Sequence, residues 1–131
     1  MKYLLDTMVW LWSVGEAGRL NREAREVLID PEHELYLSAA SVWEIAIKSS
    51  IGRLALPESP RLLIPRETAH QRLRPLPVSY THALGVFDLP LHHGDPFDRV
   101  LVAQALSEGL ALITADRQLK SYPVEILWAG K

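Results

Sequence analysis

The chain has 131 residues, a length that suits one compact domain and that can bury a sizeable core without disulfides or a structural metal. Hydrophobic residues make up 48% of it and charged residues 23%, and the formal net charge of −2 does not by itself indicate nucleic-acid binding. No cysteine is present, which excludes cysteine-based zinc sites and catalytic thiols and fits a reducing cytoplasm. Asp6 interrupts the apolar start, and no apolar run approaches the roughly 18 residues of a membrane span, so we expect neither a signal peptide nor a membrane anchor.

The first third of the chain alternates short apolar runs with helical patterns. Residues 3–5 indicate a buried strand, and a helix that includes residues 11–13 is predicted to begin soon after Asp6. Residues 21–29 have the spacing of an amphipathic helix with Asn21 as its N-cap, and residues 35–37 indicate a second strand.

The middle of the chain begins with the helix predicted from Ser38 to about residue 51, where Gly52 stops it. Trp43, Ile47 and Ile51 recur at a spacing of four and form one apolar face of this helix. A further helix is predicted over residues 61–73, with Pro65 near a start or a break. A short strand over residues 76–78 and a short helix over residues 80–87 follow.

The last third carries the strongest helix signal. Asp95 is a suitable N-cap, Pro96 occupies the first helical position, and Gly109 ends the pattern, so a helix is predicted over residues 96–108. Residues 110–114 and 124–127 indicate two more strands. Strands that alternate with helices predict a mostly parallel sheet covered on both faces, which is an α/β fold in three layers formed by residues 1–131 as one domain.

Four acids follow the predicted strands or lie on the helices that leave them: Asp6, Glu44, Asp98 and Asp116. In open parallel sheets, ligands bind beyond the carboxyl ends of the strands, so we expect these four side chains to face one solvent-accessible pocket. Each acid also has a structural interpretation. Asp6 and Asp116 can cap helices, and Ser41-x-x-Glu44 and Asp95-x-x-Asp98 match capping boxes.

Together the four acids favour a metal site. Clustered carboxylates without basic partners raise one another's pKa, and a divalent cation relieves that repulsion. A ligand set made only of oxygens suits Mg²⁺ or Mn²⁺ rather than zinc.

Four segments make the chain resemble a known family. They are Leu4-Leu-Asp6-Thr7, Ser41-Val-Trp-Glu44-Ile-Ala-Ile-Lys48, Asp95-Pro-Phe-Asp98-Arg99 and Thr114-Ala-Asp116-Arg117. In order, spacing and length the chain resembles the PIN-domain ribonucleases, and among them the VapC-like toxins of bacterial type II toxin–antitoxin pairs. Each motif alone is weak, whereas the four in sequence are fairly specific.

The resemblance implies hydrolysis of RNA phosphodiester bonds at an acidic site for Mg²⁺ or Mn²⁺. It also implies a homodimer that a cognate antitoxin inhibits by covering the site. Asp6, Glu44, Asp98 and Asp116 fall on the family's acidic positions. The chain departs from the pattern at Met8, where many relatives have a polar residue, and this puts a supporting role for position 8 in doubt.

Roles within the site follow from the chemistry. Asp6 and Asp98 are our choice for the principal metal ligands, while Glu44 and Asp116 complete the shell, hold water or bind a second ion. Asp95 competes with Asp98, which we prefer because the third position of a helix points its side chain inward while Asp95 caps.

Further polar residues are candidates for supporting roles. Thr7 and Thr114 either orient carboxylates or form turns. Lys48, one turn beyond Glu44, forms either a surface ion pair or a contact with the substrate phosphate. Arg99 and Arg117 each follow a site acid and are candidates for RNA contact, whereas the adjacent histidines at 92 and 93 are assigned to a loop.

Two alternatives remain at this point: a Mg²⁺-dependent phosphotransfer domain of the receiver type, and a non-catalytic interaction module with a PIN-like fold. A receiver needs adjacent acids after its first strand, whereas here Asp6 stands alone. The apolar residues Val9, Trp10, Leu11 and Trp12, together with the resemblance, favour a homodimer. The RNA target, the cleavage site, the antitoxin and the number of metal ions stay open.

Overall fold

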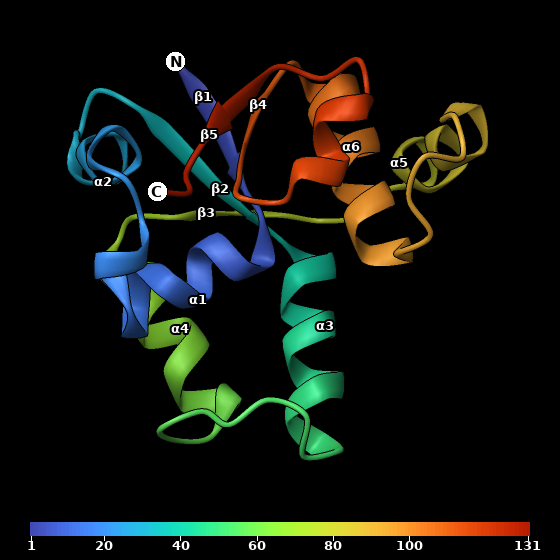
Figure 1. Cartoon of the computed structure of the whole chain (residues 1–131). Helices are drawn as coiled ribbons and strands as arrows, with labels where there is room; N and C mark the ends of the chain where they lie inside the picture. Colours follow the sequence, from blue (N-terminus) through green and yellow to red (C-terminus); the bar gives the residue numbers. More distant parts are fainter.

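The computed structural model describes residues 1–131 and contains a five-stranded parallel sheet between two layers of helices (Figure 1). The strand order is β3-β2-β1-β4-β5, and all four pairings are parallel. The strands are β1 (Lys2–Leu5), β2 (Glu34–Ser38), β3 (Arg74–Leu76), β4 (Ala111–Thr114) and β5 (Ile126–Trp128). The predicted three-layer α/β fold is therefore confirmed.

Helices connect these strands on both faces of the sheet. The α-helices are α1 (Thr7–Gly15), α2 (Arg22–Ile29), α3 (Ala39–Ser50), α4 (Pro60–His70), α5 (Tyr80–Gly85) and α6 (Pro96–Glu108). Short 3₁₀ turns are η1 (Ala17–Arg19), η2 (Val86–Asp88) and η3 (Arg117–Ser121). None of the helices is long and apolar enough to cross a membrane.

The core divides into two clusters because successive side chains of a strand point to opposite faces. In β1, Tyr3 and Leu5 join one cluster, with residues of α1, α2 and α4, while Leu4 joins the other, which packs against α6. In β4, Ile113 lies in the first cluster and Leu112 in the second. Both faces of the central strands are thus buried, which explains why these strands are continuous apolar runs in the sequence.

Some predicted boundaries are wrong by a few residues. The third strand is Arg74–Leu76 rather than residues 76–78, the last is Ile126–Trp128 rather than 124–127, and α4 ends at His70 rather than residue 73.

Pro65 lies inside α4, where a break or a start was expected. The helix continues past it because Leu63 and Ile64 are buried in the core, and this packing offsets the one backbone hydrogen bond that proline removes.

Polar caps start the helices that follow the strands. Asp6 caps α1, Ser38 caps α3 and Asp95 caps α6, each by accepting a hydrogen bond from a backbone N–H of the first turn. The capping box predicted at Ser41-x-x-Glu44 is wrong, because Ser38 is the cap and Ser41 lies buried inside α3.

Candidate active site

A pocket of about 390 Å³ lies at the edge of the sheet where the strands end. It is lined by five acids, namely Asp6, Glu44, Asp95, Asp98 and Asp116. Strands β1 and β4 are neighbours, and the chain leaves β1 for one side of the sheet and returns on the other. This reversal of strand order is where open parallel sheets form binding crevices, because the connections on its two sides diverge.

Asp6 occupies the junction between β1 and α1 and is buried. Its Oδ1 accepts a hydrogen bond from the Met8 N–H at 3.0 Å, and its Oδ2 accepts one from Thr114 Oγ1 at 2.5 Å. Both oxygens are therefore fixed in direction. The capping role and a role in the site are compatible, since the same carboxylate both starts α1 and lines the pocket.

Thr114, at the end of β4, links two of the acids. Its hydroxyl donates to Asp6 and accepts a hydrogen bond from the backbone N–H of Asp116 at 3.0 Å. Asp116 in turn caps η3 through Oδ1.

Thr7 makes a different contact from the one expected, because its hydroxyl donates to Ser41 Oγ at 2.8 Å rather than to a carboxylate. Thr7 thus joins α1 to α3, the helix that carries Glu44.

Glu44 is buried on α3, and its two oxygens differ. Lys48 Nζ donates to Oε2 at 2.5 Å, whereas Oε1 is buried and has no hydrogen-bond partner. Hydrogen bonding to Glu44 raises the pKa of Lys48 and keeps its ammonium charged. The Lys48 side chain is 44% exposed and also lines the pocket, so the ion pair lies at its rim.

Asp98 and Asp95 both lie at the start of α6. Asp95 Oδ1 accepts from the backbone N–H groups of Phe97 and Asp98, as expected of the cap. The Asp98 side chain is only 15% exposed, and its Oδ2 lies 2.8 Å from Nε2 of His93. The same nitrogen lies 3.5 Å from Oδ2 of Asp116. His93 lies in a loop, as predicted, and its ring contacts two of the acids.

Burial and mutual repulsion shift the acids towards their neutral forms. Desolvation is the largest cause and raises the pKa of Asp98 to about 7, with the charge of Asp6 adding to it. Desolvation also raises the pKa of Asp6, and the hydrogen bonds from Thr114 and Met8 oppose this. The charges of Asp116 and Glu44 raise it further.

These features fit a divalent cation. Glu44 Oε1 is a buried acceptor without a partner, and the acids repel one another in a site that holds a single lysine ammonium close to them. A cation would give Glu44 Oε1 a partner and would relieve the repulsion between the acids. The carboxylate oxygens are the donors that Mg²⁺ and Mn²⁺ accept.

Other predicted contacts lie elsewhere. Arg99 was a candidate for RNA contact, but it is buried and its guanidinium donates to backbone carbonyls of residues 86–93. It anchors a loop instead, because five donors in a planar fork suit several carbonyls at once. Arg117 is exposed. Arg53, which sequence analysis did not single out, lines the acidic pocket from the connection after α3.

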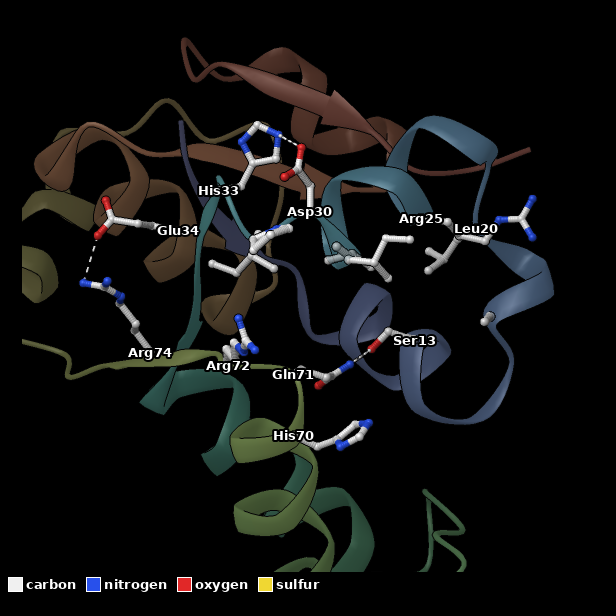
Figure 2. A pocket seen from close by; sticks show the side chains of 15 residues that line it. Ser13, Leu20, Arg25, Asp30, His33, Glu34, His70, Gln71, Arg72 and Arg74 are labelled. Atoms are coloured by element: carbon white, nitrogen blue, oxygen red, sulfur yellow. Dashed lines mark hydrogen bonds and ion pairs between the residues drawn. The ribbon is translucent and has the colours of Figure 1, made fainter.

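A larger cavity of about 750 Å³ lies at the opposite edge, where β2 and β3 begin (Figure 2). Its polar lining includes Arg25, Arg72 and Arg74 and holds the Asp30–His33 pair. Arg74 is paired with Glu34 at 2.8 Å. This cavity lacks the converging carboxylates, so the smaller acidic pocket is the candidate active site.

Comparison with known proteins agrees with this geometry. The PIN domain family matches residues 3–125. Ribonuclease VapC22 of Mycobacterium tuberculosis is 34% identical over 120 residues, which are 91% of this chain and 90% of that protein. VapBC2 from Rickettsia felis, solved with a DNA fragment from its promoter, has a TM-score of 0.74 at 14% identity over 98% of both chains. VapBC-5 of Mycobacterium tuberculosis, from the VapBC family of toxin–antitoxin systems, has a TM-score of 0.64 at 19% identity and covers 99% of this chain and 98% of its own.

The chain therefore belongs to the PIN-domain family. PIN domains are metal-dependent nucleases, so membership confirms the class of enzyme expected from the four acidic motifs. It also removes the receiver-type alternative, which would require a different family.

Proposed function

We propose that this protein is a metal-dependent endoribonuclease and the toxin of a type II toxin–antitoxin pair. The observation that carries the proposal is the convergence of Asp6, Glu44, Asp98 and Asp116 on one pocket at the point where the strand order reverses. The relative named ribonuclease VapC22, which matches most of the chain, supports RNA as the substrate.

The acids hold the cation. Asp6 and Asp98 would be the principal ligands, because both are shielded from solvent, and burial and the neighbouring acids raise the pKa of each carboxyl. Glu44, through its unpaired Oε1, and Asp116 complete the shell. Asp95 is less suited to this role, since its Oδ1 already accepts two backbone hydrogen bonds. When bound, the cation would supply a water of lowered pKa and neutralise charge on the phosphate.

The remaining residues position these groups. Thr114 fixes the Asp6 carboxylate and the backbone of Asp116 with one hydroxyl, so it sets the separation of two ligands. Lys48 stays charged at the rim, where its ammonium approaches a phosphate oxygen of the substrate as charge builds up on it. Thr7, through Ser41, sets the orientation of α3 and hence of Glu44.

We assign Mg²⁺ or Mn²⁺ as the cofactor and a cognate antitoxin as the protein partner. Solved structures of the same fold support the latter, among them a toxin–antitoxin complex from Klebsiella pneumoniae and a member of the VapBC family of toxin–antitoxin systems. We further propose a homodimer and a cytoplasmic location.

Only part of the expected dimer surface is accessible, since Leu11 and Trp12 are half-buried and Val9 and Trp10 are fully buried. Val9 and Trp10 belong to the core, and Leu11 and Trp12 pack against it. Exposed apolar side chains gather instead on the segment around α5 and η2, where they are Val78, Tyr80, Leu84, Phe87 and Leu91.

The deciding experiment is RNA cleavage by purified protein free of antitoxin. The protein is stripped with EDTA and assayed on total RNA, with cut sites mapped by sequencing of the new ends. We expect no cleavage in EDTA and cleavage after addition of Mn²⁺ or Mg²⁺. Cleavage in EDTA would overturn the metal mechanism. Absence of cleavage in both metals, with the protein folded and metal bound, would favour the non-catalytic module.

A further inference from the structure

His93 is the imidazole that contacts the acidic cluster. Its side chain is 15% exposed, and Nε2 rather than Nδ1 is the atom directed at the carboxylates. It lies 2.8 Å from Asp98 Oδ2 and 3.5 Å from Asp116 Oδ2, and the three atoms all fall within 4.8 Å of one another. His92, the preceding residue, is exposed and packs on Tyr122 instead.

The backbone of His93 is held by two buried side chains, Tyr122 and Arg99. Its backbone carbonyl accepts a hydrogen bond from Tyr122 Oη at 3.4 Å and one from Arg99 Nη1 at 3.5 Å. Arg99 also donates to the carbonyls of Pro90 at 2.9 Å and Val86 at 3.1 Å, so it holds the loop on both sides of the turn. These bonds hold the backbone of His93, so the loop places its imidazole beside Asp98 and Asp116.

The donor spacing matches one coordination sphere. Ligands about 2.1 Å from an octahedral ion lie about 3.0 Å apart when adjacent and about 4.2 Å apart when opposite. The separations of 2.8 and 3.5 Å from Nε2 to the two carboxylates fall near the spacing of adjacent ligands.

From this arrangement we propose that His93 binds the catalytic cation through Nε2, together with Asp98 and Asp116, and so makes the site selective for a transition-metal ion over Mg²⁺. The inference rests on the proposed function, since it concerns the same site. An imidazole nitrogen strengthens the binding of first-row transition ions, whereas Mg²⁺ gains little from leaving oxygen ligands. The site is then a mixed nitrogen and oxygen set rather than the carboxylate set that the four acids alone suggest.

Mn²⁺ itself provides the test without an activity assay. Its binding to metal-stripped protein is followed by the loss of the free-ion signal in electron paramagnetic resonance. A histidine nitrogen that coordinates Mn²⁺ is detected by electron spin echo envelope modulation. The measurement is made on protein with unlabelled histidine and on protein with ¹⁵N-labelled histidine. Wild type is compared with His93→Gln and with His92→Gln as the matched control, and thermal melts confirm that each variant is folded.

We expect ¹⁴N modulation in wild type and in His92→Gln. A ¹⁵N pattern should replace the ¹⁴N modulation when histidine is labelled, and the modulation should be absent in His93→Gln. The dissociation constant for Mn²⁺ should rise at least about tenfold in His93→Gln, while that for Mg²⁺, measured by competition, changes less than about threefold. Should His93→Gln not fold, the labelled wild type and His92→Gln together still decide whether a histidine other than His92 is bound.

Two outcomes would overturn the inference. Mn²⁺ bound without nitrogen modulation in wild type would make His93 only a hydrogen-bond partner of Asp98, and the proposed nuclease function would stand. Equal loss of Mg²⁺ and Mn²⁺ affinity in His93→Gln would remove the claimed selectivity. Failure of the proposed function has a different signature, since wild type would then bind the metal with nitrogen ligation and still leave RNA intact.

Discussion

Asp6 combines two demands in one side chain. It starts α1 by accepting from the Met8 N–H, and it faces the acidic pocket with an oxygen that Thr114 holds in place. A cap needs only a short polar side chain, whereas a metal ligand needs the negative charge. Substitution by asparagine separates the two roles because it keeps the shape and removes the charge.

We predict that Asp6→Asn abolishes RNA cleavage and lowers Mn²⁺ affinity at least about tenfold while the fold is retained. Asparagine keeps one acceptor oxygen for the Met8 N–H, and its amide nitrogen can donate to Thr114 Oγ1, so the loss in stability is at most about 1 kcal/mol. Removal of a buried, repelled charge offsets that loss, so stability holds or rises. Cleavage assays, Mn²⁺ titration and urea unfolding measure the three effects.

Asp88→Asn is the matched control for that substitution, because Asp88 is exposed in η2 and lies outside the acidic pocket. It should behave as wild type in all three measurements. Wild-type cleavage by Asp6→Asn in both Mg²⁺ and Mn²⁺ would restrict Asp6 to its capping role.

Asp98 makes the stability of the metal-free protein depend on pH. Its pKa is about 7 in the folded protein, against an ordinary value of 3.8. Between these values the folded state keeps a proton that the unfolded state has lost, so the free energy of unfolding falls as pH rises and the loss is complete above about pH 7. From about pH 5 to about pH 8 this contribution amounts to about 2–3 kcal/mol.

Urea unfolding in EDTA at these two pH values, for wild type and Asp98→Asn, tests this. We expect the stability of Asp98→Asn relative to wild type to rise by that amount from the lower to the higher pH. A constant difference between the two proteins would show that Asp98 is already ionised at about pH 5. Added Mn²⁺ should flatten the wild-type profile, because the cation replaces the proton.

At the scale of elements, α6 and the loop before it act as one unit. Arg99 lies in the first turns of α6 and is buried without a carboxylate partner, so its charge is compensated by carbonyl dipoles of residues 86–93. The same loop carries His93 and leads into the cap Asp95. The helix that presents Asp98 therefore also fixes the segment that faces Asp98.

Arg99→Lys should destabilise the protein by about 2–4 kcal/mol, because a single ammonium cannot reach the carbonyls that the guanidinium bridges and leaves some of them unpaired. Amide exchange of residues 86–93 should accelerate more than that of β1 or β4. Arg117→Lys is the control, since Arg117 is exposed and its substitution should change stability by no more than about 0.5 kcal/mol. Equal effects of the two substitutions would contradict the anchoring role.

The elements differ in how far the sequence determines them. Caps such as Asp95 and Asn21, and the apolar runs of β1 and β4, are local signals and were predicted correctly. The four acids could be chosen because parallel strands end at a common edge. The contacts of His93 and Arg99 could not be predicted, because they depend on the path of the irregular loop 86–95, which no periodicity describes.

On the scale of the whole molecule, the acidic pocket lies at the edge where the strands end and the larger cavity lies at the opposite edge (Figure 2). Val9 and Trp10 of the N-terminal helix, which had been expected at a dimer contact, lie in the core, whereas Leu11 and Trp12 are half-buried. The exposed apolar residues of segment 78–91 offer a further surface for contact between two copies.

The last prediction concerns that segment. Leu84 is 70% exposed and Phe87 is 90% exposed, so aspartate at both positions should leave the monomer folded. Burial of a leucine or phenylalanine side chain contributes about 1.5–3 kcal/mol, and each occurs twice in a symmetric dimer, so Leu84→Asp with Phe87→Asp should raise the dimer dissociation constant at least about 100-fold.

Sedimentation velocity of antitoxin-free protein at micromolar concentration should show a wild-type dimer and a double variant that is monomeric. Ile29→Asp, at a position on α2 that is 81% exposed, is the control and should remain dimeric. A monomeric wild type would exclude the dimer, and a double variant that dimerises like wild type would place the interface on another surface.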